Sequence, residues 1–368
     1  MQKPKVIPID DINLNITPSR EDLFALGWEV RNKEYSNSLG TLDPEITAAC
    51  DHKCEHCWAD LTGKHMKLEK FKEILNFAKS QNIGTLQFTG GEPTLNPEFL
   101  EMARLAKNEG FELILRTHGR NLPKPASRKD PEGQTFAEAI AECFDEIVIS
   151  IDGAAEENFA MRPAKNFDRS ANKSNKAEYL KIATQQYDET IAGLQAMSDA
   201  IRQRDNDNVK LKVNSVIAKK NFFAMGKFGR ELQSLKDSGV KIDRWDMTEA
   251  MPSFFSDTLK SQYLLEAGEF TQSLLDATMA TTDIAIKGKG RTSARCLIAD
   301  NAGRIYVGGS TQDFLGTVCL NSDVGIGDNV RNSRADKKLA QQRNVSYIEL
   351  KPHNRISNYS PNTDPSIS

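Results

Sequence analysis

The chain has 368 residues, of which 39% are hydrophobic and 27% charged, proportions typical of a globular protein with a sizeable core. Its formal net charge of −3, from 48 basic and 51 acidic residues, argues against a dedicated nucleic-acid binder, which would carry a strongly basic face. We see no signal-peptide h-region, no apolar run approaching ~18 residues and too few cysteines for a disulfide framework, so we expect a cytoplasmic protein that does not enter membranes.

Strand and helix patterns alternate along most of the chain after a polar N-terminal extension, residues 1–41. Alternating apolar residues predict strands at 43–48, 85–88, 111–117, 146–152, 209–217 and 240–247. A helical period of apolar residues predicts helices at 67–80, 97–108, 135–144, 178–204, 222–237 and 261–279. Such alternation implies a parallel sheet with right-handed crossovers.

Six strand–helix units are too few for a closed eight-fold barrel, so we expect a partial (β/α)6 TIM-like barrel over residues 42–280. An open doubly wound sheet is the alternative. After residue 280 the pattern changes, and a β-hairpin around residues 300–303 is predicted within a small C-terminal α+β cap, residues 281–335. Residues 336–368 read as a polar tail.

Three of the six cysteines, Cys50, Cys54 and Cys57, form a C-x3-C-x2-C cluster directly after the first predicted strand. The residues between them are charged or histidine, which argues against three buried structural cysteines. A zinc site with His52 or His65 as the fourth ligand is an alternative, although the sequence has no second C-x2-C pair to match that of Cys54 and Cys57. Three thiolates on an iron–sulfur cubane would leave one iron with an open position, where a substrate or cofactor can bind.

The stretch CDHKCEHCW, which ends with Trp58, resembles the signature of the radical S-adenosylmethionine (radical SAM) superfamily. The resemblance implies one [4Fe–4S] cluster held by the three cysteines and SAM chelated at the open iron. It further implies reductive cleavage of SAM to a 5′-deoxyadenosyl radical, which abstracts hydrogen from the substrate. An electron donor such as flavodoxin or ferredoxin is implied as a partner.

A second motif, FTGGEP, follows the second predicted strand and resembles the family's GGEP motif. In that family, the backbone and the glutamate of this motif contact the amino group of the SAM methionine. The resemblance therefore implies that SAM is bound by Thr89, Gly90, Gly91 and Glu92, while Pro93 fixes the turn.

Polar residues at the ends of later strands add to the resemblance. Ser150 and Asp152 lie on one face of their strand and resemble the family's Ser-x-Asp pair near the SAM ribose and carboxylate. Arg162 matches an arginine near the methionine carboxylate, with a surface arginine as the alternative. In the fifth strand Asn214 or Ser215 is expected to contact SAM, and the register decides which of them points inward.

His118 stands where the family often has asparagine. It is either a general acid or base at the mouth of the site or, as we favour, a loop histidine whose hydrogen bonds are satisfied within the protein.

The remaining cysteines separate into two kinds. Cys143 shares a helical face with apolar residues and is expected in the core. Cys296 and Cys319 flank a segment that resembles the start of a SPASM or twitch auxiliary domain, but two cysteines are too few for a further cubane. We therefore expect a degenerate cap. In it Cys319 or Cys296 is either a hydrogen-atom donor to a substrate radical or, as we favour, a small apolar residue of the cap.

The combined prediction is a radical SAM enzyme that oxidises, cross-links or epimerises a peptide or a small metabolite. One alternative is a zinc-stabilised binding module without catalysis. Another is an RNA-modifying radical SAM enzyme. The segment 119–131 would then supply a basic cluster of Arg120, Lys124, Arg128 and Lys129, although such a cluster is more often a solvated loop.

Overall fold

The computed structural model describes part of the chain. The described residues are 41–57, 59, 61–80, 83–127, 130–167, 175–204, 208–250, 257–289, 296–299, 304–308 and 318–319. The expected N-terminal extension, apart from Thr41, and the expected polar tail lie outside these ranges.

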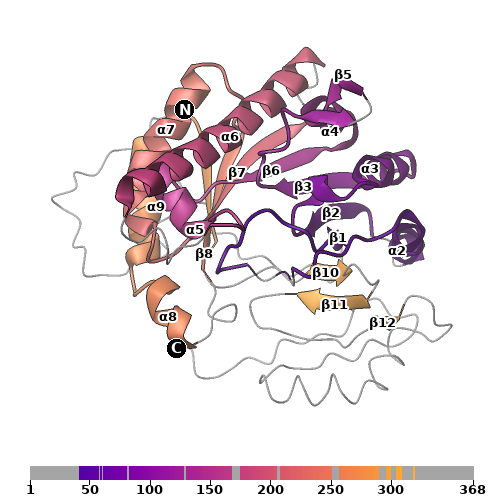
Figure 1. Ribbon diagram of the computed structural model, residues 1–368, viewed down its shortest axis with the longest axis horizontal. Helices are drawn as coiled ribbons and strands as arrows, with labels where there is room; N and C mark the ends of the chain where they lie inside the picture. The colour runs from indigo at the N-terminus through magenta and orange to yellow at the C-terminus, as the bar shows by residue number, and fades with distance from the viewer. Residues whose placement is uncertain are drawn as a thin grey trace, which may run out of the picture.

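One large sheet organises these residues (Figure 1). Its strands are β1 (Thr41–Thr47), β2 (Thr85–Gly90), β3 (Glu112–Thr117), β6 (Glu146–Ser150), β7 (Lys210–Ile217), β8 (Arg244–Glu249), β9 (Ala285–Lys289), β10 (Cys296–Ala299), β11 (Arg304–Gly308) and β12 (Val318–Cys319). Two short strands, β4 (Pro125–Ser127) and β5 (Asp130–Thr135), pair separately as an antiparallel hairpin.

Helices connect the parallel strands. They are α2 (Leu68–Ser80), α3 (Phe99–Asn108), α4 (Phe136–Cys143), α5 (Ala155–Met161), α6 (Lys176–Gln203), α7 (Met225–Asp237), α8 (Asp257–Tyr263) and α9 (Glu269–Ala280), with 3-10 turns η2 (Pro93–Leu95) and η3 (Phe222–Ala224). The predicted helix at 261–279 is wrong as a single element, because Gly268 takes a left-handed φ of 88° and separates α8 from α9.

The strand order decides between the two architectures. From β1 through β2, β3, β6, β7 and β8 to β9, each strand lies beside the next one in the chain, and every pair is parallel. Right-handed crossovers that always advance in one direction place their helices on one face of the sheet. A doubly wound sheet would reverse direction at a switch point, so that alternative is wrong. The seventh parallel strand, β9, was not predicted.

The two edges of the sheet, β9 and β12, do not pair in the described residues, so the sheet is an open one. The predicted C-terminal hairpin is confirmed as β10 and β11, and β10 pairs in parallel with β1. The described part of the C-terminal third therefore extends the main sheet. The limits of the cap and its likeness to a SPASM or twitch domain stay predictions.

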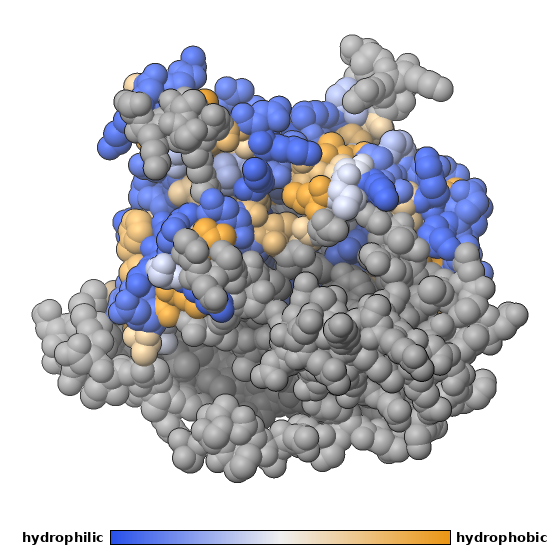
Figure 2. All heavy atoms as spheres, turned by 60° about the horizontal axis from the view of Figure 1, so that its bottom comes forward, coloured by the Kyte–Doolittle hydropathy of each residue, from blue (hydrophilic) through white to orange (hydrophobic). Residues whose placement is uncertain are grey.

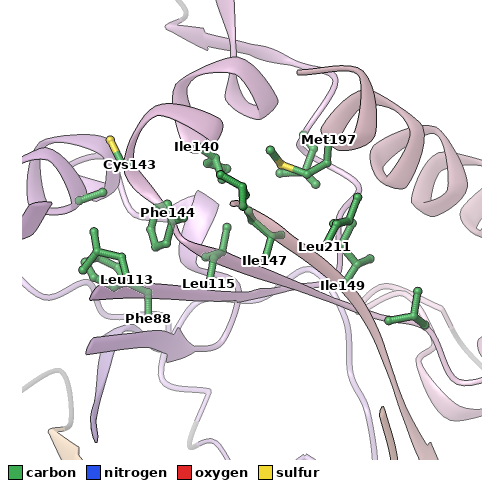
Figure 3. Packing of buried hydrophobic residues seen from close by; sticks show 14 of the residues in the cluster. Phe88, Leu113, Leu115, Ile140, Cys143, Phe144, Ile147, Ile149, Met197 and Leu211 are labelled. Carbon is green, nitrogen blue, oxygen red and sulfur yellow. The ribbon is translucent and has the colours of Figure 1, made fainter. Parts of the chain in front are cut away.

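The core fills the space between the sheet and the helices. Phe88 of β2 packs against Phe144 with ring centroids 5.3 Å apart, and Phe144 stacks on Phe99 of α3 at 5.8 Å. Figure 3 shows Ile140 of α4 and Met197 of α6 above apolar residues of the strands. Cys143 is 3% exposed within this cluster, so its predicted place in the core is confirmed.

On the face seen in Figure 2, the described residues are mainly hydrophilic, with separate hydrophobic areas between them. No described helix has the length and apolar composition that a membrane span needs.

Candidate functional site

The loop that carries the three cysteines follows β1 and is fixed against the end of β2. The Gly91 amide donates to the Thr47 carbonyl at 2.7 Å, and the Glu92 amide donates to the Ala49 carbonyl at 2.8 Å. A Cβ on Gly90 or on Gly91 would lie 2.1 Å from one of these carbonyl oxygens. Only glycine permits this contact, so the two sequence motifs meet directly in the structure.

Cys50, Cys54 and Cys57 all have free, half-buried thiols. Burial raises the pKa of Cys50 to about 12 and also raises the pKa of Cys54 and Cys57, while the positive charge of Arg162 acts in the opposite direction on the latter two. A metal centre that binds these thiols must displace their protons, and a nearby cation favours the thiolate form.

Arg162 reaches this loop from the end of α5 as the partner of Asp152. Its Nε lies 2.7 Å from Asp152 Oδ2, and its side chain is 13% exposed, so the alternative of a surface arginine is wrong. Asp152 is fully buried and accepts the Val216 amide at 2.7 Å. His56, in the cysteine loop, places Nε2 3.6 Å from Asp152, and burial lowers the pKa of His56 to about 4, so this imidazole is neutral at pH 7.

Glu92 is buried beneath the same loop. Its Oε1 accepts the hydroxyls of Thr94 and Thr117 at 2.6 and 2.8 Å, and its Oε2 accepts the backbone amide of His118 at 2.9 Å. A carboxylate offers about four lone-pair sites, so Oε2 retains room for a further donor.

His118 is 5% exposed and its ring has polar partners, as a satisfied loop histidine would have, and a role as general acid or base stays a prediction. Its Nε2 lies 2.7 Å from Asp51 Oδ1, inside the cysteine loop, and 3.4 Å from Glu92. Burial acts to lower the pKa of His118, but Glu92 and Asp51 outweigh it and raise that pKa. Asp51 and its partner Arg120 were missed, and the departure of His118 from the family motif was the one signal that pointed to them.

Arg120 also bonds Glu189 of α6 through Nε at 2.7 Å, so it is not part of an exposed basic cluster. Arg128 and Lys129 lie outside the described residues. His52 and His65, the alternative zinc ligands, have polar partners within the protein. His65 Nδ1 lies 2.9 Å from the Thr47 hydroxyl, and His52 Nε2 lies 3.2 Å from Arg120.

The register of β6 and β7 separates Asn214 from Ser215. The Ser215 hydroxyl donates to the Ile151 carbonyl and accepts from the Trp245 indole at 2.9 Å, on the face that packs against α7. Asn214 pairs with Ser150 and therefore shares the opposite face with it. This geometry favours Asn214 over Ser215 as a cofactor contact.

The side chains of three predicted site residues lie outside the described part of the structure. Trp58 lies outside the described residues. The backbone of Cys296 pairs with Gly308 in β10 and β11, and that of Cys319 pairs with Arg304 in β11 and β12, but their side chains are not described.

The residues present fit a three-thiolate cluster with a second ligand beside it. Three thiols share one loop, a buried cation lies near them, and Glu92 keeps an accepting position. In the described part of the chain, the buried Thr89 hydroxyl at the end of β2 and His56 Nδ1 have no hydrogen-bond partner. Unsatisfied buried polar atoms are costly, and a bound ligand would satisfy them.

Comparison with known proteins agrees with this geometry. Residues 45–203 match the family model of the radical SAM superfamily. The chain contains a radical SAM domain. This family uses a [4Fe–4S] cluster and SAM, which are the groups the site fits.

Two relatives show how far the likeness extends. The chain is 35% identical over 75 residues to an S-adenosylmethionine-dependent nucleotide dehydratase of Thermoplasmatales archaeon (strain ISO4-H5), covering 20% of this chain and 27% of that protein. It is 30% identical over 130 residues to mycofactocin maturase MftC of Mycobacterium tuberculosis (strain ATCC 25618 / H37Rv), covering 34% and 30%. The chain thus spans less than a third of either relative.

Among solved structures, native anSMEcpe with bound AdoMet superposes with a TM-score of 0.51 at 15% identity, over 81% of each chain. This likeness shows a shared fold.

Proposed function

We propose that the chain is a radical SAM enzyme whose [4Fe–4S] cluster is held by Cys50, Cys54 and Cys57. The observation that carries this proposal is the direct contact between the cysteine loop and the Gly90–Gly91 turn, with the Asp152–Arg162 pair beside it. When bound and reduced, the cluster supplies the electron that cleaves SAM, and the resulting 5′-deoxyadenosyl radical abstracts hydrogen from the substrate.

The chain's own residues bind and orient SAM. The backbone of Gly90 and Gly91, the Thr89 hydroxyl and Glu92 Oε2 hold the methionine amino group. Arg162 holds the methionine carboxylate, while Asp152 keeps the guanidinium in place. Ser150 and Asn214 line the ribose side, and Ser215 supports β7 from the opposite face. Trp58, the residue after Cys57 in the sequence, is a further candidate cofactor contact.

The substrate is a peptide or a small metabolite, which the enzyme oxidises, cross-links or epimerises. Relatives named as a maturase and as a nucleotide dehydratase support this breadth without selecting one reaction. Cys319 or Cys296 serves as a hydrogen-atom donor if the product is an epimer. A Cys319→Ser variant that incorporates solvent deuterium as the parent protein does would exclude that residue.

The electron donor is a small acidic protein such as flavodoxin or ferredoxin. Lys53 lies within the cysteine loop, and Lys165 is joined to that loop by a backbone hydrogen bond to Asp51 at 2.7 Å. Because these two residues flank the bridge between His52 and Ala164, their side chains share one face, and both are exposed. We call them the loop lysines. A positive surface beside the cluster favours encounter with an acidic carrier.

The test is anaerobic reconstitution followed by iron, sulfide and zinc analysis and a dithionite-driven assay for 5′-deoxyadenosine. We expect four iron atoms per chain and 5′-deoxyadenosine from the parent protein and from Cys143→Ala, whose thiol lies in the core. We expect neither from Cys54→Ser. Zinc alone, with no SAM cleavage, would support the zinc-stabilised binding module instead.

A further inference from the structure

Glu55 joins the cysteine loop to two residues that lie far away in the sequence. It is the residue after Cys54 and stands two positions before Cys57. Its Oε2 accepts a hydrogen bond from the Tyr263 hydroxyl and lies 3.1 Å from Lys220 Nζ. Lys220 also donates to the Tyr263 hydroxyl at 2.6 Å. The three groups therefore contact one another pairwise.

Both partners are held firmly by the fold. Tyr263 is the last residue of α8 and is fully buried, in a small apolar cluster with Met161, Ala218 and Ala250. Lys220 follows β7, and its Nζ lies 4.0 Å from the centroid of the Tyr263 ring, a favourable cation–π distance. A buried tyrosine hydroxyl needs a hydrogen-bond partner, and here that partner belongs to the cysteine loop.

We propose that Glu55, Lys220 and Tyr263 form a positioning clamp that anchors the segment between Cys54 and Cys57 to α8 and offsets the carboxylate charge beside the cluster. This inference rests on the proposed function, because it assumes that these thiols hold a cluster. The three hydrogen bonds described for the clamp join its own members and do not involve the expected SAM contacts. The clamp acts through Cys54 and Cys57, first by restricting the loop and then by setting the local charge.

The two parts of the clamp separate by mutation. Tyr263→Phe removes the anchoring hydroxyl but leaves both charges. Lys220→Met removes the ammonium that lies beside the Glu55 carboxylate, whereas Glu55→Gln removes the carboxylate charge that lies beside the ammonium. Lys219→Met is the matched control, because Lys219 is the adjacent lysine and forms its ion pair with the exposed Glu266, away from the loop.

The first measurement uses the full chain without metal, so it does not depend on the cluster. Alkylation of each thiol is followed by mass spectrometry, with the melting temperature measured alongside. In Tyr263→Phe we expect Cys54 and Cys57 to react roughly ten- to a hundredfold faster, the change that loss of one hydrogen bond to a charged group produces. Cys143 and the Lys219→Met variant should react as in the parent protein. Unchanged rates for Cys54 and Cys57 would overturn the anchoring role.

The second measurement is the midpoint potential of the reconstituted cluster, followed by its electron paramagnetic resonance signal. A negative charge near a cluster disfavours its reduction, so we expect Lys220→Met to lower the potential and Glu55→Gln to raise it, with the double variant in between. A purely structural role would move both single variants in the same direction or leave both unchanged. Failure of the parent protein to load iron would refute the proposed function, whereas normal loading with unmoved potentials would refute only the charge-offsetting role of the clamp.

Discussion

Replacement of Gly91 by alanine tests the contact on which the whole site depends. The new Cβ would lie 2.1 Å from the Ala49 carbonyl oxygen, whereas such contacts are not found below 3.0 Å, so the two segments must separate by about 0.9 Å. That movement stretches the hydrogen bonds from Gly91 to Thr47 and from Glu92 to Ala49. Overpacking typically costs about 1–3 kcal/mol and each bond about 0.5–1.5 kcal/mol, so we expect a loss of roughly 2–6 kcal/mol.

Urea unfolding of the metal-free chain, followed by circular dichroism, measures this loss directly. Gly84→Ala is the matched control, because Gly84 directly precedes β2, the strand that Gly91 follows, and a Cβ on Gly84 would meet nothing within 4 Å. We expect the control to be neutral or slightly stabilised, since alanine restricts the unfolded chain. Cluster loading should fall in Gly91→Ala alone. If both variants unfold at the same urea concentration and load equal iron, the argument from close approach is refuted.

Three further predictions use other parts of the chain. Gly193→Ala in α6 should lower the melting temperature, because its Cβ would lie 2.1 Å from the Gly119 carbonyl oxygen. Gly226→Ala in α7 is the control, since its Cβ would have no neighbour closer than 3.4 Å, and it should leave the melting temperature unchanged or raise it. Thr135 and Glu138 form a capping box at the start of α4, in which the backbone and hydroxyl of Thr135 hold the pKa of Glu138 below its ordinary value. The stabilisation by this capping box is therefore present above about pH 4.5 and is lost as the pH falls further. The stability difference between the parent protein and Glu138→Gln should shrink below that pH. Reduction of the cluster by an acidic protein donor should slow as the salt concentration is raised, and it should slow further when the loop lysines are replaced by methionine. Reduction by dithionite is the control, and equal slowing of the variants with dithionite would contradict a docking role.

Several features were readable from the sequence because they depend on local patterns. The alternation of strand and helix periods predicted six of the seven consecutive parallel strands, and the cysteine spacing with the GGEP motif predicted the radical SAM domain. The strand β9 was missed because its five residues, AIKGK, contain two lysines and a glycine and show little apolar signal. The single helix expected at 261–279 failed at Gly268, where a backbone conformation outweighed an apolar pattern.

The sequence alone thus determined which residue types were available for metal and cofactor, because thiols, glycines and carboxylates declare their chemistry through spacing. Only the tertiary structure decided which of them meet. It buried Arg162 against Asp152 and joined His118 to Asp51 and Glu92. It also tied Glu55 to Tyr263 across 208 positions of the chain. Such contacts depend on strand order and register, which bring distant segments to one end of the sheet, and no local pattern encodes the distance between them.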